Sequence, residues 1–176
     1  MEKKQQENLK DNTKMITCII PTYKQLNYLL DSIKSVLAQN YPCIELIITD
    51  DASDNFDENL IKEYVNANNR GNIINYKIIT NKENVGTVKN MNGALRQAHG
   101  EIVISLAADD IFYDEYVISN IVNRFAETNC EIMSCSRLMF STDMTQEIRL
   151  MPHKGYRSYI EKHMDTAQKQ YKQMSL

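Results

Sequence analysis

Two acidic pairs in this chain each follow a segment that reads as a β-strand. The pair Asp50–Asp51 follows Ile44–Thr49, and the pair Asp109–Asp110 follows Ile102–Leu106 and two alanines. Carboxylates gathered in one place repel one another unless a cation or ligand N–H and O–H groups share their charge. Proteins often hold Mg²⁺ and similar ions with one or two carboxylates and the phosphates of a substrate. The pairs are therefore candidates for a nucleotide or metal site.

The rest of the chain supplies elements that would bring these pairs together. Short β-branched runs predict strands at Ile16–Ile20, Ile44–Thr49, Ile73–Thr80, Ile102–Leu106 and Glu131–Phe140. Apolar residues spaced three and four apart predict helices at Gln25–Gln39, Asp57–Asn68, Val88–Ala98 and Asp114–Thr128. This alternation predicts an α/β fold with a mostly parallel sheet and helices on both faces, a three-layer α/β/α arrangement. Ligands of such sheets bind beyond the carboxyl ends of the strands, where both acidic pairs lie.

Three further expectations concern how these elements pack. The run Ile102–Leu106 is nearly all apolar, which predicts a strand buried on both faces. Gly100 follows the third helix, in a position where glycine tolerates the left-handed conformation. The residues expected to form the apolar face of that helix are Val88, Met91, Leu95 and Ala98.

Each motif also has an interpretation without chemistry. An Asp and a Ser after a strand, as in Asp50–Ser53, often form a turn whose side chains cap the next helix, and an Asp-Asp pair can do the same. Tyr23, directly after Pro21 and Thr22, could belong to the core, or it could face a cleft and stack on a base or ribose. Lys89 could approach a diphosphate or lie on a solvated helix face. From the residues alone, both interpretations stay open.

Composition and charge exclude several classes of protein. The chain has 176 residues, 43% of them hydrophobic, which suits one globular domain with its own core. Twenty Lys and Arg against 23 Asp and Glu give a net charge of −3, which argues against a nucleic-acid binder. No G-x-G-x-x-G follows the first strand and no Walker A motif is present, so the common dinucleotide and P-loop sites are excluded.

The sequence shows no sign of export. Residues 1–14 are polar and hold no apolar core of a signal peptide, and no window of about 20 apolar residues could span a membrane. The four cysteines, none in a C-x-x-C spacing, are expected to be free and mostly buried thiols. We therefore expect a cytoplasmic protein, and peripheral association with the inner face of the membrane stays open.

The chain resembles the nucleotide-sugar-binding half of glycosyltransferase family 2. The resemblance lies in three segments that occur in the family's order: ITCIIPTYKQLNYLLDSIKSVLAQNYP, IELIITDDASDN and NKENVGTVKNMNGALRQAHGEIVISLAADDIF. It covers roughly Met15–Phe140. Each segment is weak evidence alone, but the ordered set is specific. The resemblance implies the GT-A fold, a Rossmann-like form of the α/β architecture.

The resemblance also implies roles for individual residues. Asp51 matches the carboxylate that accepts from the base, typically from the N–H of uracil. Asp109 matches the last Asp of the family's D-x-D motif, which holds Mn²⁺ or Mg²⁺ against the diphosphate, and Asp110 follows it. In such a site the metal offsets the charge of the departing nucleoside diphosphate. The full set of residues expected around the nucleotide is Pro21, Thr22, Tyr23, Asp50, Asp51, Ser53, Asn84, Gly86, Lys89, Asn92 and Ala108.

The chain departs from the family pattern in two places. Ala107 stands where the family has the first Asp of D-x-D, and Met91 stands where many members carry Arg. Inverting members also supply a general base well after D-x-D. The carboxylates available for this role are Glu147, Glu161 and Asp165, none in a recognisable motif, so the catalytic base is not identified.

The resemblance implies an enzyme that binds a nucleotide-diphosphate sugar, with a UDP-sugar favoured, and transfers the sugar with inversion to a glycan, lipid or protein acceptor. Residues 1–14 would form a polar lead, residues 15–140 the nucleotide-sugar-binding domain, and residues 141–176 a truncated or partial acceptor-side region with a helix at Tyr159–Met174. One alternative is a truncated or non-catalytic sugar-nucleotide-binding domain. Another is a nucleotidyltransferase-like or plain nucleotide-binding domain, which the missing glycine-rich loop disfavours.

Overall fold

The computed structural model describes residues 13–128, 130–141 and 144–152. The chain divides into two compact units, residues 1–129 and residues 130–176, and each is described by itself. The helix expected at Tyr159–Met174 lies outside the described residues. Within the described part of the chain, no helix is both long enough and apolar enough to cross a membrane.

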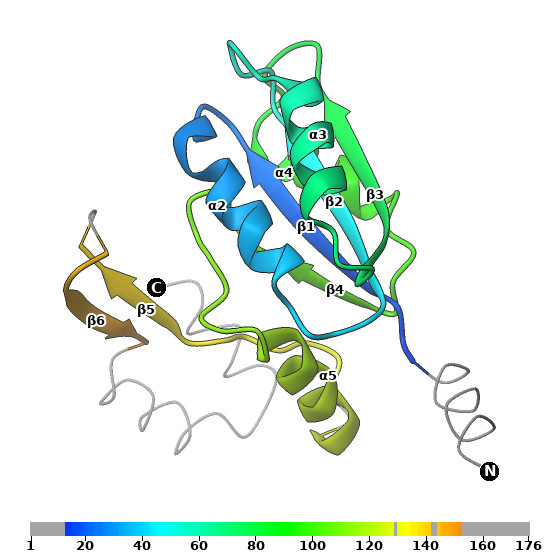
Figure 1. The fold of residues 1–176 in the computed structure, drawn as a ribbon, viewed down its shortest axis with the longest axis vertical. Helices are drawn as coiled ribbons and strands as arrows, with labels where there is room; N and C mark the ends of the chain where they lie inside the picture. Colours follow the sequence, from blue (N-terminus) through cyan, green and yellow to red (C-terminus); the bar gives the residue numbers. More distant parts are fainter. Residues whose placement is uncertain (1–12, 129, 142–143, 153–176) are drawn as a thin grey trace. The chain divides into compact units, whose positions relative to one another are not determined.

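The first unit is built on a parallel sheet (Figure 1). Its described strands are β1 (Ile16–Thr22), β2 (Ile44–Asp50), β3 (Ile73–Thr80) and β4 (Ile102–Ser105), in the order β3-β2-β1-β4. All neighbours in this sheet run parallel. Parallel neighbours need crossover connections, and these are the helices that the apolar periodicity predicts. The expected α/β fold with a mostly parallel sheet is confirmed.

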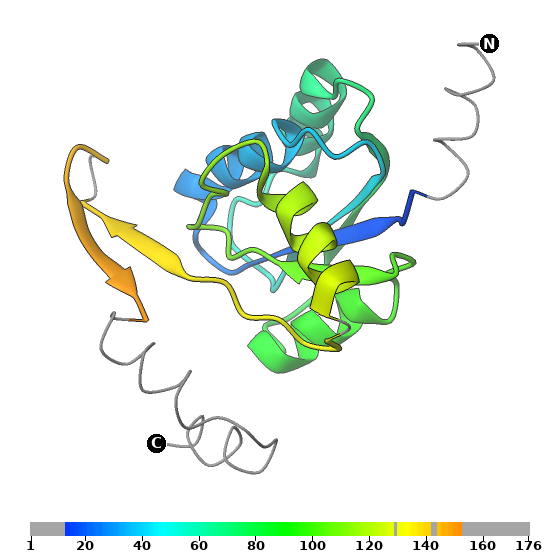
Figure 2. The same ribbon diagram turned by 90° about the horizontal axis from the view of Figure 1, so that it is seen from below.

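Helices cover both faces of this sheet. The described helices are α2 (Leu26–Leu37), α3 (Glu58–Asn68), α4 (Thr87–Leu95) and α5 (Val117–Thr128). Figures 1 and 2 show α2 and α3 on one face and α4 on the other. The Asp57 carboxylate accepts from the N–H groups of Asn59 and Leu60, each at 3.0 Å, and so fixes the start of α3.

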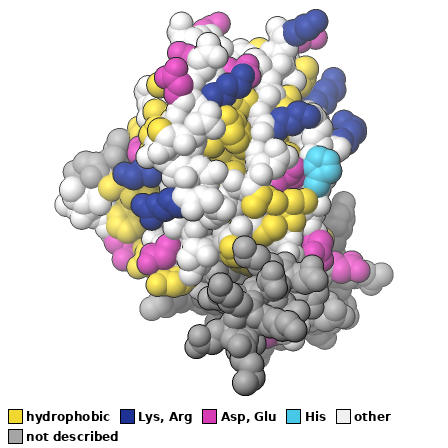
Figure 3. Space-filling model, turned by 45° about the vertical axis from the view of Figure 1, so that its right-hand side comes forward, with side chains coloured by type: hydrophobic (Ala, Val, Ile, Leu, Met, Phe, Trp, Pro, Cys, Tyr) yellow, Lys and Arg dark blue, Asp and Glu magenta, His cyan; other side chains and the backbone are white. Residues whose placement is uncertain are grey.

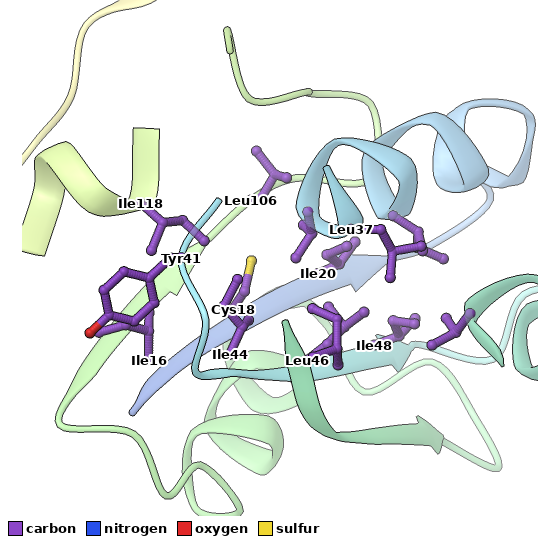
Figure 4. Close-up of a cluster of buried hydrophobic side chains, with 14 of the residues drawn as sticks. Ile16, Cys18, Ile20, Leu37, Tyr41, Ile44, Leu46, Ile48, Leu106 and Ile118 are labelled. Carbon is purple, nitrogen blue, oxygen red and sulfur yellow. The ribbon is translucent and has the colours of Figure 1, made fainter. Parts of the chain in front are cut away.

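The main core lies between the sheet and α2, α3 and α5 (Figure 4). Alternate residues of β1 and β2 point to this side and are fully buried, because side chains of a strand alternate between its faces. They are Ile16, Cys18, Ile20, Ile44, Leu46 and Ile48. Burial raises the pKa of the Cys18 thiol to about 12, so this thiol stays protonated and unreactive.

The cysteines are free, as expected, but they are not mostly buried. Cys18 is buried, Cys43 and Cys130 are half-buried, and Cys135 is exposed. Cys43 lies just before β2, and Cys130 and Cys135 belong to the second unit. A thiol outside a central strand has less structure packed around it, and this accounts for the difference.

The face of the sheet that meets α4 carries polar side chains as well as apolar ones. Glu45 on β2 is buried, and its carboxylate accepts from Thr17 Oγ1 at 2.6 Å and from the His99 N–H at 2.8 Å. His99 Nδ1 also lies 2.8 Å from Glu45 Oε1. Burial by itself would raise the pKa of Glu45, but the bonds from Thr17 and His99 outweigh burial and lower it. An ionised Glu45 therefore anchors the segment that joins α4 to β4.

The expected apolar face of α4 is rotated in the structure. Asn90 and Ala94 are the buried residues of this helix, whereas Val88 is 74% exposed and Leu95 is 40% exposed. Met91 and Ala98 pack against the small apolar cluster on this side of the sheet, as expected. The helix turns Asn90 inward because its amide bonds to β2, as described below, and that polar pairing overrides the apolar stripe. Figure 3 shows hydrophobic side chains left exposed in several patches between charged and polar ones.

Three other expectations are also wrong. The strand β4 is an edge strand among the described residues, and Val103 on it is 40% exposed, so it is not buried on both faces. The fifth strand, β5, begins at Arg137 and pairs antiparallel with β6 (Glu147–Met151) in the second unit, and the Ser141 N–H donates to the Gln146 carbonyl at 2.9 Å beyond the ends of the two strands. The helix α5 begins at Val117, since the Asp114 carboxylate bonds the Tyr116 N–H before the helix starts.

Gly100 is needed for a reason other than the expected one. It is not among the glycines with positive φ, which are Gly71 and Gly86. A Cβ atom on Gly100 would instead lie 2.3 Å from the Thr17 backbone nitrogen. The Gly100 N–H donates to Thr17 Oγ1 at 2.8 Å. Glycine is required here because the chain passes directly against β1.

Gly100→Ala is expected to lower the free energy of unfolding by about 1–3 kcal/mol, because the added methyl group overlaps the Thr17 backbone. The matched control is Gly93→Ala, since a Cβ on this helical glycine meets no atom within 4 Å. The control is expected to be neutral or to stabilise by up to about 1 kcal/mol. Urea or thermal unfolding measures both, and equal stabilities of the two variants would contradict the close approach.

Candidate functional site

The carboxyl ends of β1 and β2 lie side by side, and this brings two of the predicted segments together. Thr22 lies opposite Asp50 in the sheet. Beyond these residues, the Asp51 N–H donates to the Thr22 carbonyl at 3.0 Å, and the Lys24 N–H donates to Ser53 Oγ at 2.8 Å. The segments Pro21–Tyr23 and Asp50–Ser53 therefore form one continuous edge.

The sheet divides next to this edge, between β1 and β4. The strand β4 pairs with β1 only over Ile16–Ile19, and the Leu106 N–H then bonds the Ile19 carbonyl at 2.9 Å. Pro21 has no N–H to donate, so it cannot extend the pairing of β1 with β4, although β1 stays paired with β2 as far as Thr22. The strand order also reverses here, because the chain continues from β1 to β2 on one side and reaches β4 on the other. Ligands of open α/β sheets bind at such switch points.

Asp50 and Thr22 leave polar atoms unused at this edge. Asp50 is fully buried, and its Oδ2 accepts from the Ser53 N–H at 2.8 Å. Its Oδ1, like Thr22 Oγ1, is buried and has no hydrogen-bond partner among the described residues. Unpaired buried polar atoms cost free energy, so proteins rarely keep them without a reason. The two strand ends therefore have hydrogen-bonding capacity that the folded chain does not use.

Asp51 holds the loop that follows β3. The Asp51 carboxylate is buried and accepts from Asn81 Nδ2 at 2.9 Å, from the Val85 N–H at 2.9 Å and from the Gly86 N–H at 2.8 Å. Burial alone would raise the pKa of Asp51, but the bonds from Val85, Asn81 and Gly86 outweigh burial and lower it. Asp51 is therefore ionised at neutral pH and acts only as a hydrogen-bond acceptor.

Three polar residues that sequence reasoning missed complete this network. Thr49 Oγ1 donates to Asn90 Oδ1 at 2.6 Å, and Asn81 Nδ2 donates to the same oxygen at 3.0 Å. The Asn90 amide nitrogen returns a bond to the Thr49 carbonyl at 3.2 Å. Asn81 thus links Asn90 to Asp51, and β2, α4 and the loop between them form one unit. The polar Thr49 in an apolar strand was the one signal in the sequence.

The other expected nucleotide contacts lie around this edge. Gly86 has a φ of +86° at the start of α4, where its N–H points to Asp51. Tyr23 is 42% exposed, and Lys24 Nζ lies 5.1 Å from the centre of its ring. Asn84, Lys89 and Asn92 are exposed on the loop and on α4.

The second acidic pair lies in a turn after β4. The Asp110 N–H donates to the Ala107 carbonyl at 3.0 Å and closes this turn. Ala108 packs into the core, which makes it a support for the turn, whereas Asp109 is exposed and Asp110 is half-buried. Within the described ranges, no three His, Cys, Asp or Glu side chains are placed to hold an ion together. The exposed Asp109 fits an ion that takes most of its ligands from phosphate and water, as Mg²⁺ commonly does.

The candidates for a general base all belong to the second unit of the chain. Glu147 lies on β6 in the second unit and is exposed. Glu161 and Asp165 lie outside the described residues. The catalytic base therefore stays unidentified.

Comparison with known proteins now identifies the family. The family model of glycosyl transferase family 2 matches residues 17–174, which is most of the chain. The chain belongs to glycosyltransferase family 2. The matched residues include most of β1, the turn after β2, the loop before α4 and the turn after β4, which together form the carboxyl edge described above.

Similar proteins extend this result to the fold. The bifunctional glycosyltransferase pgtA of Dictyostelium discoideum is 30% identical over 130 residues, 72% of this chain and 16% of its own length. Among solved structures, the Pyrobaculum calidifontis mannosyltransferase PcManGT in complex with GDP-Man and Mn²⁺ has a TM-score of 0.60 at 23% identity, over 67% of this chain and 34% of that one. Staphylococcus aureus TarS 1-349 in complex with UDP-GlcNAc has a TM-score of 0.57 at 23% identity, over 72% and 38%.

The structural neighbours confirm the expected GT-A-like fold. The part of the chain that matches these curated relatives spans only 16–36% of their length.

Asn90→Ala is expected to lower the free energy of unfolding by about 2 kcal/mol, because Thr49 Oγ1 is buried and loses its acceptor. Asn92→Ala is the matched control, since Asn92 is exposed on the same helix, and its effect should stay within about 0.5 kcal/mol. Urea unfolding without ligand measures both variants. An equal loss of unfolding free energy in the two variants would show that the buried hydrogen bonds of Asn90 do not stabilise the fold.

Proposed function

We propose that this chain is the donor-binding part of a family 2 glycosyltransferase. It binds a nucleotide-diphosphate sugar, with a UDP-sugar favoured, together with Mn²⁺ or Mg²⁺. The sugar then passes with inversion to a glycan, lipid or protein acceptor. The observation that carries the proposal is the carboxyl edge, where ionised Asp51 follows β2 and exposed Asp109 follows β4, the strands on either side of β1 in one parallel sheet.

The ionised carboxylate of Asp51 favours binding of a nucleotide base that presents an N–H group. A carboxylate has about four acceptor positions, and hydrogen bonds from the chain take three of them. An ionised carboxylate can accept from the N3–H of uracil or the N1–H of guanine, whereas adenine presents an acceptor at its N1. The unpaired Thr22 Oγ1 and Asp50 Oδ1 lie beside it as further polar atoms. Uridine nucleotides are therefore preferred over adenosine nucleotides.

The diphosphate would lie on the other side of the switch point, toward Asp109. A divalent ion bound there would neutralise charge on the departing nucleoside diphosphate. Asp109 would hold it, with Asp110 beside it and the phosphates as further ligands. Two structural neighbours support this choice of ligand, since one was solved with GDP-Man and Mn²⁺ and the other with UDP-GlcNAc. Ala107 leaves the site with one carboxylate fewer than the family's D-x-D motif.

The alternative is a sugar-nucleotide-binding domain that does not turn over. Ala107 favours it, because the missing carboxylate removes a contact to ribose or metal. Both functions use the same donor site, so ligand binding does not separate them. Release of UDP from UDP-sugars in the presence of candidate acceptors does, because only an active transferase gives a rate above that of the Asp109→Ala variant.

The metal role of Asp109 is tested by thermal unfolding with UDP, GDP or ADP, each with Mn²⁺ and with a chelator. A ligand at about 100 times its Kd stabilises by about 2.7 kcal/mol, which is a shift of roughly 5–10 °C for a chain of this size. We expect the UDP shift to need Mn²⁺. Asp109→Ala should abolish this metal-dependent shift and leave the ligand-free midpoint unchanged, because the side chain is exposed.

Asp31→Ala is the control for Asp109→Ala, because Asp31 is an exposed aspartate on α2. It should keep the full shift with UDP and Mn²⁺. A metal-dependent shift that survives in Asp109→Ala would reject the assigned role. No shift with any nucleotide in the wild type would favour an incomplete donor site.

Base recognition is tested with Asp51→Asn, measured by titration calorimetry with UDP and ADP. The amide has one oxygen where the carboxylate has two, so UDP binding should weaken about tenfold or more while ADP binding changes less. Asp54→Asn is the control, since Asp54 is exposed in the same turn. Equal binding of UDP and ADP by both the wild type and Asp51→Asn would show that Asp51 does not read the base.

A further inference from the structure

The loop that carries Asp109 is held by polar side chains of α2. This loop runs from the end of β4 to the start of α5 and contains no regular helix or strand. Ser32, Ser35 and Gln39 follow one another at spacings of three and four, so they lie along one side of α2 and its final turn. Each of them bonds to the loop or to its far end. We call these three residues the polar ladder.

Ser32 contacts the turn of the acidic pair directly. Its side chain is fully buried, and its Oγ donates to the Ala107 carbonyl at 3.3 Å. The same carbonyl accepts from the Asp110 N–H at 3.0 Å, and that bond closes the turn in which Asp109 lies. The turn is thus bound to α2 at the atom that closes it.

Ser35 holds the loop on the other side of the acidic pair. Its Oγ donates to the Ser32 carbonyl at 2.8 Å and accepts from the Phe112 N–H at 3.1 Å. Ser32 and Ser35 therefore bracket Asp109 and Asp110, one before and one after. A short loop that is fixed at both ends has few conformations left, so the backbone at Asp109 is ordered before any ligand binds.

Gln39 fixes the end of the loop at α5. It is buried, its Nε2 donates to the Asp114 carbonyl at 2.6 Å, and its Oε1 accepts from the Ile118 N–H at 3.0 Å. The first N–H groups of a helix have no partner within the helix, and here a residue after another helix supplies one. Gln39 thus joins the end of α2, the loop and the start of α5.

We propose that the polar ladder consists of positioning residues that set Asp109 for the metal ion of the donor site. The inference rests on the proposed function, in which Asp109 holds that ion. A metal ligand must be held to within about half an ångström of its productive place by the groups around it. Because α2 packs on β1, the ladder ties Asp109 to the strand that carries the nucleoside side of the site. It preorganises the one D-x-D carboxylate that remains beside Ala107.

The test compares UDP binding with Mn²⁺ and with a chelator in a Ser32→Ala/Ser35→Ala double variant. The Kd with Mn²⁺ should rise about five- to tenfold, the effect of roughly one lost hydrogen bond, while the Kd with chelator stays within about twofold. A merely structural role would weaken both equally. A Ser32→Ala/Ser35→Thr variant keeps a hydroxyl at position 35. It should recover part of the metal-dependent affinity that the double alanine variant loses.

Ser119→Ala is the matched control. Ser119 Oγ donates to Asn40 Oδ1 at 2.5 Å, so this variant also removes a hydroxyl between the end of α2 and α5, but outside the turn of the acidic pair. It should keep the wild-type metal dependence. A double variant whose metal-dependent affinity equals that of the wild type would overturn the proposal, as would a Ser119→Ala variant that loses as much.

Amide hydrogen exchange without ligand tests the ladder independently of the proposed function. Exchange at Asp110 and Phe112 should be several-fold faster in the double variant and unchanged in Ser119→Ala. If the wild type gains no UDP affinity from Mn²⁺, the proposed metal role of Asp109 fails. Unchanged exchange at Asp110 and Phe112 in the double variant overturns the ladder in either case, so the two failures are distinguishable.

Discussion

The register of β1 against β2 is the constraint on which the rest of the structure depends. Thr22 lies opposite Asp50 at one end and Thr17 lies opposite Glu45 at the other, where their side chains bond. A slip by one residue would turn every side chain of a strand to the other face. Thr49 would then lose Asn90, and Asp51 would no longer meet the loop before α4. One pairing thus sets both the core and the polar edge.

Two loops at this edge are ordered in the same way, by side chains that lie on a regular element or directly after one. Asp51, just after β2, holds the backbone at Val85 and Gly86, and the serines of α2 hold the turn that contains Asp109. A loop lacks the regular backbone hydrogen bonds of a helix or a sheet, so side chains must bond its N–H and carbonyl groups. The sheet and α2 therefore fix the positions of the loops, and the loops contain the residues proposed to contact the ligand.

Periodicity predicted the four strands of the sheet and its helices, because long apolar patterns report which segments are regular. It could not predict the orientation of α4, since Asn90 and Asn92 look alike in sequence and only the bond to Thr49 turns one of them inward. The closeness of Gly100 to Thr17 and the hairpin of β5 depend on which distant segments meet. Ser32 and Ser35 were missed for the same reason: a small polar residue in a helix gives no sign of the backbone it bonds.

The order of the strands also bears on how the chain is made. The strand β1 meets β2 after a single helix, but its other neighbour, β4, is the last of the sheet's described strands to be synthesised. While the ribosome is still adding α3, β3 and α4, one side of β1 has no partner, and Glu45 lacks the backbone N–H of His99. An open edge on an apolar strand is a template for pairing with other chains. The nascent protein is therefore most exposed to aggregation until Ile102–Ser105 emerge and close the central strand.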